Sequence, residues 1–217
     1  MRTTLFRKTA LTAAGLAFAG GAIAGPVAAM AAPTHTGTTT AVVQAERRPN
    51  SERELDVRYE AQPNFYFCGP AAARNALSVQ GKNIDVHAMA EEMGTTENGT
   101  DSINDITPVL NKQTGRDVYR SVETPDKPDR KQTERLRADI VGTVDDGRAV
   151  VANVAGTATD TDGVTHAFEG GHYISVIGYR DGGDVVTIAD SADPAHATYR
   201  MSVTELADWI ATRGYAH

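Results

Sequence analysis

The chain has 217 residues, a formal net charge of −7 and a single cysteine. An acidic balance without a clustered Lys/Arg stretch argues against nucleic acid and anionic membranes as partners, because their phosphates require cationic contacts. One cysteine excludes an internal disulfide. Together with scattered histidines it also excludes a closed metal site, so neither a metal nor another cofactor is expected.

Residues 1–31 have the composition of a secretory signal peptide. A basic head with Arg2, Arg7 and Lys8 precedes an uncharged run of small and apolar residues, which ends in the cleavage-site pattern Ala29-Met30-Ala31. A membrane anchor is the alternative, but the run is Gly-rich and shorter than the ~20 strongly apolar residues that a span needs. Cleavage after Ala31 removes three positive charges and moves the formal charge from −7 to −10. We therefore expect a secreted, extracellular product without membrane attachment.

Residues 32–54 are rich in Thr, charged and small residues without a sustained period, which predicts a flexible leader. Ordered structure is expected from about residue 55, so residues 55–217 form one domain. A domain of that length buries a core without the help of disulfides.

Three helical signals open this domain. The first helix begins at Cys68, because the following Gly-Pro step suits a first helical turn and an alanine-rich run continues it. The second spans residues 85–94, with an aspartate as N-cap and a glycine as its stop. The third spans residues 102–113, where Pro108 either kinks the helix or marks its true start.

The second half is richer in strands. Strands are expected at residues 116–123, 148–156, 172–179 and 184–191, the last two joined as a hairpin by "RDGG". Helices are expected at residues 131–147 and 202–214. The polar, Gly/Thr-rich segment 156–171 is predicted to be a long loop that borders the functional cleft. Helices first and strands afterwards predict an α+β fold, a helical lobe packed on an antiparallel sheet.

Cys68 admits two interpretations. As a small apolar residue it would belong to the core, where cysteine is often buried. As the odd cysteine of an exported chain it would be a reactive thiol. Its position at the expected start of a helix favours the second interpretation, because free N–H groups and the positive end of the helix dipole stabilise a thiolate there.

A nucleophilic thiol needs a base, and the chain has six histidines. His172 is the strongest candidate, because two glycines keep bulk away from its ring and the strand that begins at it fixes its direction. A satisfied histidine at a strand end is the alternative. The others lie in the ends of the chain (His35, His217), a short helix (His87), a turn (His196) and the polar segment, where His166 is a conceivable base.

The segment "VVTIAD" ends at Asp190 and is expected to lie beside His172. There the carboxylate could accept a hydrogen bond from the imidazole Nδ1–H and favour the tautomer that takes the thiol proton. Asp193 is the second candidate, and either aspartate could instead cap the following turn. The backbone N–H of Cys68 and the side-chain amide of Gln62 are candidate donors to an oxyanion.

In chain order, Gln62, the run Cys68-Gly69-Pro70-Ala71, "GGHYISVIGY" and "IAD" resemble papain-like cysteine peptidases. The most similar branch is that of the double-glycine leader peptidases, and within it the free-standing secreted peptidases of actinobacteria. The resemblance covers residues 59–214. It implies a papain-like fold with the cysteine on the helical lobe and the histidine and aspartate on the sheet. Relatives often have Asp-Pro where this chain has Asp190-Ser191.

The resemblance implies a role for each of four residues. Cys68 is the expected nucleophile, His172 the general base and acid, Asp190 the orienting residue and Gln62 an oxyanion donor. The expected reaction is attack of the thiolate on an amide carbonyl of a peptide or protein substrate, a thioester intermediate and hydrolysis. Transfer of the acyl group to an amine, as in a transferase or isopeptidase, and an inactive protein that binds peptides or cell wall are the alternatives.

Overall fold

The computed structural model of the protein describes residues 51–217. The expected signal peptide, and residues 32–50 of the expected leader, lie outside the described residues. The short strand Arg53–Glu54 falls within the last residues of the segment predicted as leader, where it pairs with the strand that carries Gly178 and Tyr179. None of the helices in the described part is long and apolar enough to cross a membrane.

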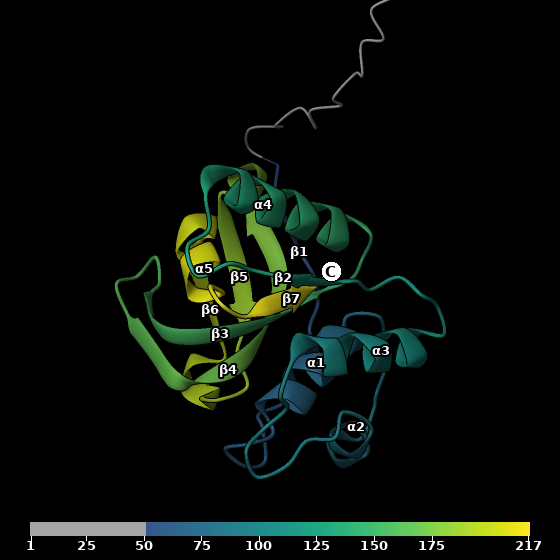
Figure 1. Cartoon of the computed structure of the whole chain (residues 1–217). Coiled ribbons are helices and arrows are strands. Elements are labelled where there is room, and N and C mark those ends of the chain that lie inside the picture. Colours follow the sequence, from purple (N-terminus) through teal and green to yellow (C-terminus); the bar gives the residue numbers. More distant parts are fainter. Residues whose placement is uncertain (1–50) are drawn as a thin grey trace, which may run out of the picture. The chain divides into compact units, whose positions relative to one another are not determined.

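In the described chain, three helices follow the short first strand, and most of the strands come in the second half (Figure 1). The helices are α1 (Cys68–Ser78), α2 (Val86–Glu92), α3 (Ile103–Thr114), α4 (Arg130–Asp145) and α5 (Val203–Trp209). The strands are β1 (Arg53–Glu54), β2 (Ser121–Glu123), β3 (Val150–Thr159), β4 (Thr165–Arg180), β5 (Val185–Ala189), β6 (Thr198–Ser202) and β7 (Gly214–Ala216). Two 3-10 turns, Asp181–Gly183 and Pro194–His196, follow β4 and β5.

The strands form one antiparallel sheet in the order β2-β7-β3-β4-β5-β6, and β1 pairs with β4 beside this path. Successive strand residues face opposite sides of a sheet. Accordingly Ile188 packs in a core cluster with α4 and α5, whereas the next residue, Ala189, packs in a second cluster with α1, α2 and α3. The N-terminal helices therefore pack on one face of a C-terminal antiparallel sheet, which confirms the predicted α+β class.

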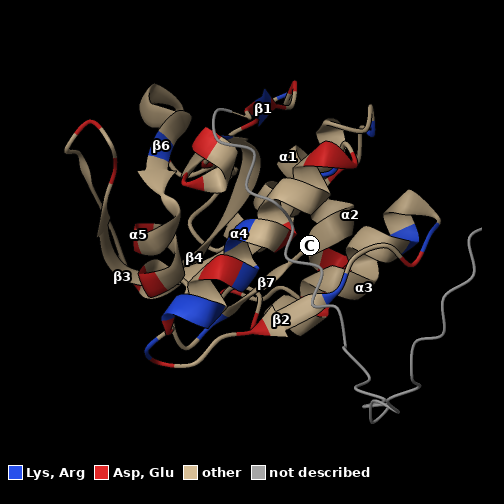
Figure 2. Cartoon of the chain, turned by 90° about the horizontal axis from the view of Figure 1, so that it is seen from above, with Lys and Arg blue, Asp and Glu red and all other residues tan. Residues whose placement is uncertain are grey.

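The other face of the sheet is covered by α4 and α5. Leu136 and Ile140 of α4 and Trp209 of α5 are buried against it. Acidic and basic residues are interleaved along the rest of α4, which is typical of a solvated helix face (Figure 2).

Local capping explains why the predicted helices form where they do. The Asp85 carboxylate accepts from two N–H groups in the first turn of α2. Ser102 and Asp105 form a capping box at the start of α3, and Gly115 ends that helix in the left-handed conformation. The box sets the start of α3, so Pro108 lies inside the helix and does not open it.

The prediction of a long loop at residues 156–171 is wrong. β3 continues to Thr159 and β4 begins at Thr165, so the segment is a hairpin in which Gly156 pairs with Phe168. Its tip is tightened by Asp160, whose carboxylate accepts from the backbone N–H of Asp162 and of Val164, at 2.9 Å each. Local turn chemistry and a two-stranded ladder thus order a segment whose composition is typical of a loop.

Two predicted boundaries are also corrected. The strand expected at 116–123 is confined to Ser121–Glu123, because the Asn111 side-chain oxygen accepts the backbone N–H groups of Val118 and Tyr119 and so takes them from a ladder. The last helix ends at Trp209 and not at residue 214. The chain instead turns and enters the sheet as β7, between β2 and β3.

Candidate active site

Cys68 is the first residue of α1, as predicted. Cys68 is buried, with 8% of the residue exposed. No side chain caps α1, which leaves N–H groups of its first turn without an intrahelical partner at the position of the thiol. This end of a helix favours negative charge.

Two hydrogen bonds attach the start of α1 and its neighbouring loop to β4. Ser175 Oγ donates to the carbonyl of Ala72 at 2.7 Å, and Tyr173 Oη donates to the carbonyl of Thr100 at 3.2 Å. Thr100 in turn packs against Gly69, where a Cβ would lie only 2.5 Å from its Oγ1. The strand that carries the candidate base is therefore held in register with the helix that carries the thiol.

His172 lies on β4, buried, and contacts both of its predicted partners. Its Nε2 is 2.7 Å from Oδ1 of Asp190, and the Cys68 thiol lies close enough to raise the pKa of the imidazole. The expectation that the aspartate would contact Nδ1 is therefore wrong. Because Nε2 is occupied by the carboxylate, Nδ1 is the nitrogen left to the thiol.

Asp190 follows β5 directly and is held by three donors. Besides His172, the backbone N–H of Ala192 donates to Oδ1 and the Tyr199 hydroxyl donates to Oδ2, each at 2.9 Å. The alternative candidate, Asp193, instead contacts Nδ1 of His196 at 2.8 Å in an exposed pair. Geometry thus brings Asp190, and not Asp193, to the candidate base.

The electrostatics of this buried cluster favour charge. Burial lowers the pKa of His172, but the hydrogen bonds and charges of Asp190 and Cys68 outweigh it and raise that pKa to about 9. Burial raises the pKa of Asp190, yet its bonds to His172, Ala192 and Tyr199 hold it below the ordinary value of a carboxyl. Burial and the neighbouring carboxylate raise the pKa of the Tyr199 phenol. An imidazolium beside a carboxylate is the favoured state.

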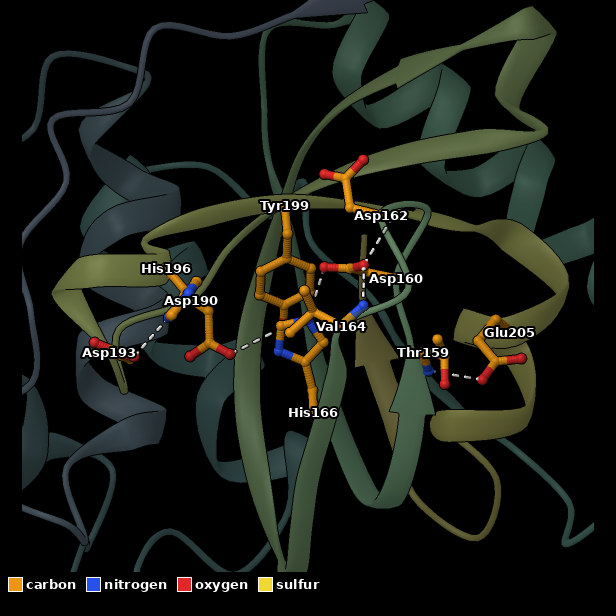
Figure 3. Close-up of polar contacts among 10 residues, drawn as sticks. All are labelled: Thr159, Asp160, Asp162, Val164, His166, Asp190, Asp193, His196, Tyr199 and Glu205. Carbon is orange, nitrogen blue, oxygen red and sulfur yellow. Dashed lines mark hydrogen bonds and ion pairs between the residues drawn. The ribbon is translucent and has the colours of Figure 1, made fainter.

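Two aromatic side chains complete the cluster and were not anticipated from the sequence. Phe168 stacks on the His172 ring with centroids 3.9 Å apart. Tyr199 stacks on His166 at 3.8 Å, and His166 in turn has its Nε2 3.1 Å from Asp160 (Figure 3). His166, the other conceivable base, is thus held by Tyr199 and Asp160. An aromatic residue four positions before the histidine was the only signal for the first of these contacts.

Gln62 is held beside Asp190, because it hydrogen-bonds the next residue, Ser191. Its backbone N–H donates to the carbonyl of Ser191 at 2.9 Å, and the Ser191 hydroxyl donates to its Oε1 at 3.1 Å. Nε2 donates to the carbonyl of Asn64 at 2.8 Å. Since an amide nitrogen carries two N–H groups, the second one has no acceptor among residues 51–217.

A cavity of about 310 Å³ adjoins the carboxylate side of the cluster. It is lined by Val164 and Phe168 of the hairpin at residues 156–171 and by Asp190. Val164 is 42% exposed, which is unusual for a large apolar side chain among the described residues. The segment 156–171 therefore borders a cavity beside Asp190, although as a hairpin and not as a loop. No three His, Cys, Asp or Glu side chains within residues 51–217 are grouped so that they could hold a metal ion.

Solved structures share this fold. The peptidase domain of Streptococcus ComA, a bifunctional ABC transporter of a quorum-sensing pathway, superposes with a TM-score of 0.52 at 19% identity, over 75% of this chain and 97% of its own. A candidate C39-like peptidase from Bacillus anthracis gives 0.52 at 14% identity, over 76% and 96%. A double-glycine motif protease from an AMS/PCAT transporter, crystallised with a leader peptide, gives 0.44 at 14%, over 77% and 94%.

No curated protein sequence matches the chain. The profile of the Peptidase C39-like family, in contrast, matches residues 54–217, which is most of the chain and, within the part that the structure describes, every helix and strand apart from the first residue of β1. The chain belongs to this family of cysteine-type peptidases.

Proposed function

We propose that the protein is an exported cysteine peptidase that hydrolyses peptide bonds through a thioester on Cys68. The observation that carries the proposal is the buried contact series from the Cys68 thiol through His172 to Asp190. Export rests on the composition of residues 1–31. The sequence pattern additionally favours the secreted, free-standing actinobacterial branch of the family.

In the proposed reaction, the proton of the Cys68 thiol has passed to Nδ1 of His172, which gives a thiolate beside the imidazolium, while Asp190 accepts the Nε2–H. The Cys68 thiolate attacks the carbonyl carbon of the scissile bond, and the developing oxyanion lies near the N–H of Cys68 and the free amide N–H of Gln62. The imidazolium then protonates the leaving amine, which gives the thioester. A water deprotonated by His172 hydrolyses it and returns the thiol.

Thiol reactivity tests the site without knowledge of the substrate. The chain offers a matched control, because His196 and Asp193 form a second His–Asp contact of similar length, 2.8 Å, at an exposed position. We expect iodoacetamide to label Cys68 faster than it labels a free thiol near neutral pH. His172→Ala should slow that labelling, whereas His196→Ala should not.

Turnover is then measured on a peptide library, with Cys68→Ala as the background. Gln62→Ala should lower turnover by about 10²–10³ if its amide donates to the oxyanion. Equal labelling rates in both histidine variants would contradict the thiol–imidazole contact as the source of reactivity. Rapid labelling without any cleavage above the Cys68→Ala background would instead contradict the peptidase activity.

A further inference from the structure

Arg213 is a cation without a counter-ion in the described part of the chain. Four arginines there have a buried Nε that lacks an acceptor: Arg74, Arg137, Arg200 and Arg213. The first three are paired through their other nitrogens with carboxylates, at 2.9, 2.8 and 3.7 Å: Glu60, Asp184 and Glu54. The Arg213 guanidinium has neither an ion pair nor a hydrogen bond to any of residues 51–217. Arg213 is only partly buried, but its Nε is shielded from solvent and has no acceptor, so an acceptor from outside would satisfy it.

The guanidinium lies directly beside the candidate active site. A Cβ built on Gly171 would be 3.5 Å from Nη2 of Arg213 and 3.6 Å from its Cζ, and Gly171 immediately precedes His172. Arg213 also lines a cavity of about 220 Å³, together with Asp101, Ser102 and Asn153. This cavity shares no lining residue with the one at the hairpin. Arg213 therefore lines this cavity and lies against Gly171, the residue before His172.

The backbone that presents Arg213 is strained. Thr212 has a φ of +64°, a left-handed conformation that a β-branched residue seldom adopts. It is held there because its N–H donates to the carbonyl of Pro125 at 3.1 Å, and because Thr124 donates its N–H to the Arg213 carbonyl at 3.1 Å. The same Thr124 donates its hydroxyl to the carbonyl of Ile210 at 2.7 Å. Residues 124–125 thus hold the turn that precedes the Arg213 side chain through three hydrogen bonds.

The acids of this cavity do not neutralise the guanidinium. Glu123 accepts a hydrogen bond from the Asn104 side chain at 3.0 Å, and neither it nor the exposed Asp101 is ion-paired with Arg213. A planar guanidinium with free edge nitrogens fits a carboxylate through two parallel hydrogen bonds. The guanidinium therefore lines the cavity without a carboxylate bound to it from residues 51–217, although Asp101 and Glu123 also line the cavity.

We propose that Arg213 binds the carboxylate of an Asp or Glu side chain in the substrate peptide. This inference rests on the proposed peptidase function and adds a substrate class to it. Since Gly171 is adjacent to His172, and an extended peptide advances about 3.3 Å per residue, the acidic residue falls within about two positions of the scissile bond. One position near the cleavage site is thus acidic in preferred substrates.

The test is a cleavage profile of a diverse peptide library, read by mass spectrometry, for the wild type, Arg213→Gln and Arg213→Lys. Synthetic pairs that differ only as Asp/Asn or Glu/Gln at the enriched position then give ratios of kcat/KM. We expect the wild type to prefer the acid by about 10–100-fold, Arg213→Lys to keep part of the preference and Arg213→Gln to lose it. The ratio cancels any general loss of activity. Arg116→Gln, which removes the same charge from an exposed turn, should keep the wild-type ratio.

Each outcome decides a different point. A wild type that cleaves peptides without enrichment of an acid, or a ratio that Arg213→Gln does not change, overturns the role of Arg213 and leaves the peptidase function intact. An equal change in Arg116→Gln would assign the preference to net charge and also overturn it. No cleavage above the Cys68→Ala background overturns the peptidase function, and the substrate class with it. A melting temperature measured for each variant separates misfolding from loss of preference.

Discussion

At the scale of residues, the buried His172–Asp190 pair links protonation to folding. The pKa of His172 is raised from its ordinary 6.5 to about 9, and that of Asp190 is lowered. Folding therefore favours the protonated imidazole and the ionised carboxylate. Phe168 stacks on the imidazole and Tyr199 donates to the carboxylate, so the two charged groups face organised partners and little water.

The sign of the His172 shift predicts how stability depends on pH. Its contribution is fully present below about pH 6.5, the pKa in the unfolded chain, and is lost as pH rises through about 9. Urea unfolding of the wild type and of His172→Gln at a series of pH values measures this. We expect the difference in the free energy of unfolding to be largest near the acid end of this window and to shrink toward about pH 10. A difference that stays constant across the window contradicts the raised pKa.

At the scale of elements, the site depends on how closely α1 approaches its neighbours. Gly69, in the first turn of α1, has no room for a side chain, because a Cβ would lie 2.5 Å from Oγ1 and 3.0 Å from Cβ of Thr100. Tyr173, the residue after His172, donates to the carbonyl of the same Thr100. A side chain at position 69 would therefore displace Thr100, which contacts both α1, where the thiol lies, and β4, where the imidazole lies.

We expect Gly69→Ala to lower the free energy of unfolding by about 1–3 kcal/mol, and to slow alkylation of Cys68, because the start of α1 must shift. The matched control is Gly142→Ala inside α4, where a Cβ would meet nothing within 4 Å. That variant should gain about 0.5–1 kcal/mol, since alanine loses less entropy than glycine in a helix. Chemical denaturation and iodoacetamide rates measure both. A Gly69→Ala protein as stable and as reactive as the wild type would show that α1 has free space at this point.

The comparison of sequence and structure separates local from tertiary causes. Caps such as Asp85 and Ser102 are local, so helix starts could be predicted. The hairpin at 156–171 was missed because it is ordered by cross-strand pairing and by the Asp160 turn, not by apolar alternation. In the site, residue types and order predicted the pairing of His172 with Asp190, which the structure brings together. The imidazole nitrogen that faces Asp190 depends on the rotation of the ring. The contact of Tyr199 with Asp190 depends on the pairing of β5 with β6. No local sequence pattern encodes either.

At the scale of the whole described domain, β7 joins the two core clusters. Tyr215 packs in the cluster with α4 and α5, and the next residue, Ala216, in the cluster with α1, α2 and α3. β7 also lies between β2 and β3 and hydrogen-bonds both. A strand of three residues therefore contributes to both faces and to the continuity of the sheet.

Removal of residues 214–217 should abolish cooperative unfolding, because β2 loses its partner and both clusters are opened. Removal of His217 alone leaves β7 intact and should preserve a sharp transition. Thermal melts followed by near-ultraviolet circular dichroism compare the two truncations. A cooperative melt of the chain that ends at Arg213 would show that the sheet is complete without β7.

The position of β7 also sets the order in which the protein can gain its reactivity. Synthesis proceeds from the N-terminus, so Cys68 and His172 emerge before the strand that completes the sheet. Until residues 214–216 follow, β2 and β3 have no common neighbour, and the strand that bears the imidazole belongs to an incomplete sheet. If the chain is exported as proposed, the sheet that carries the imidazole would be complete only once residues 214–216 had also crossed the membrane.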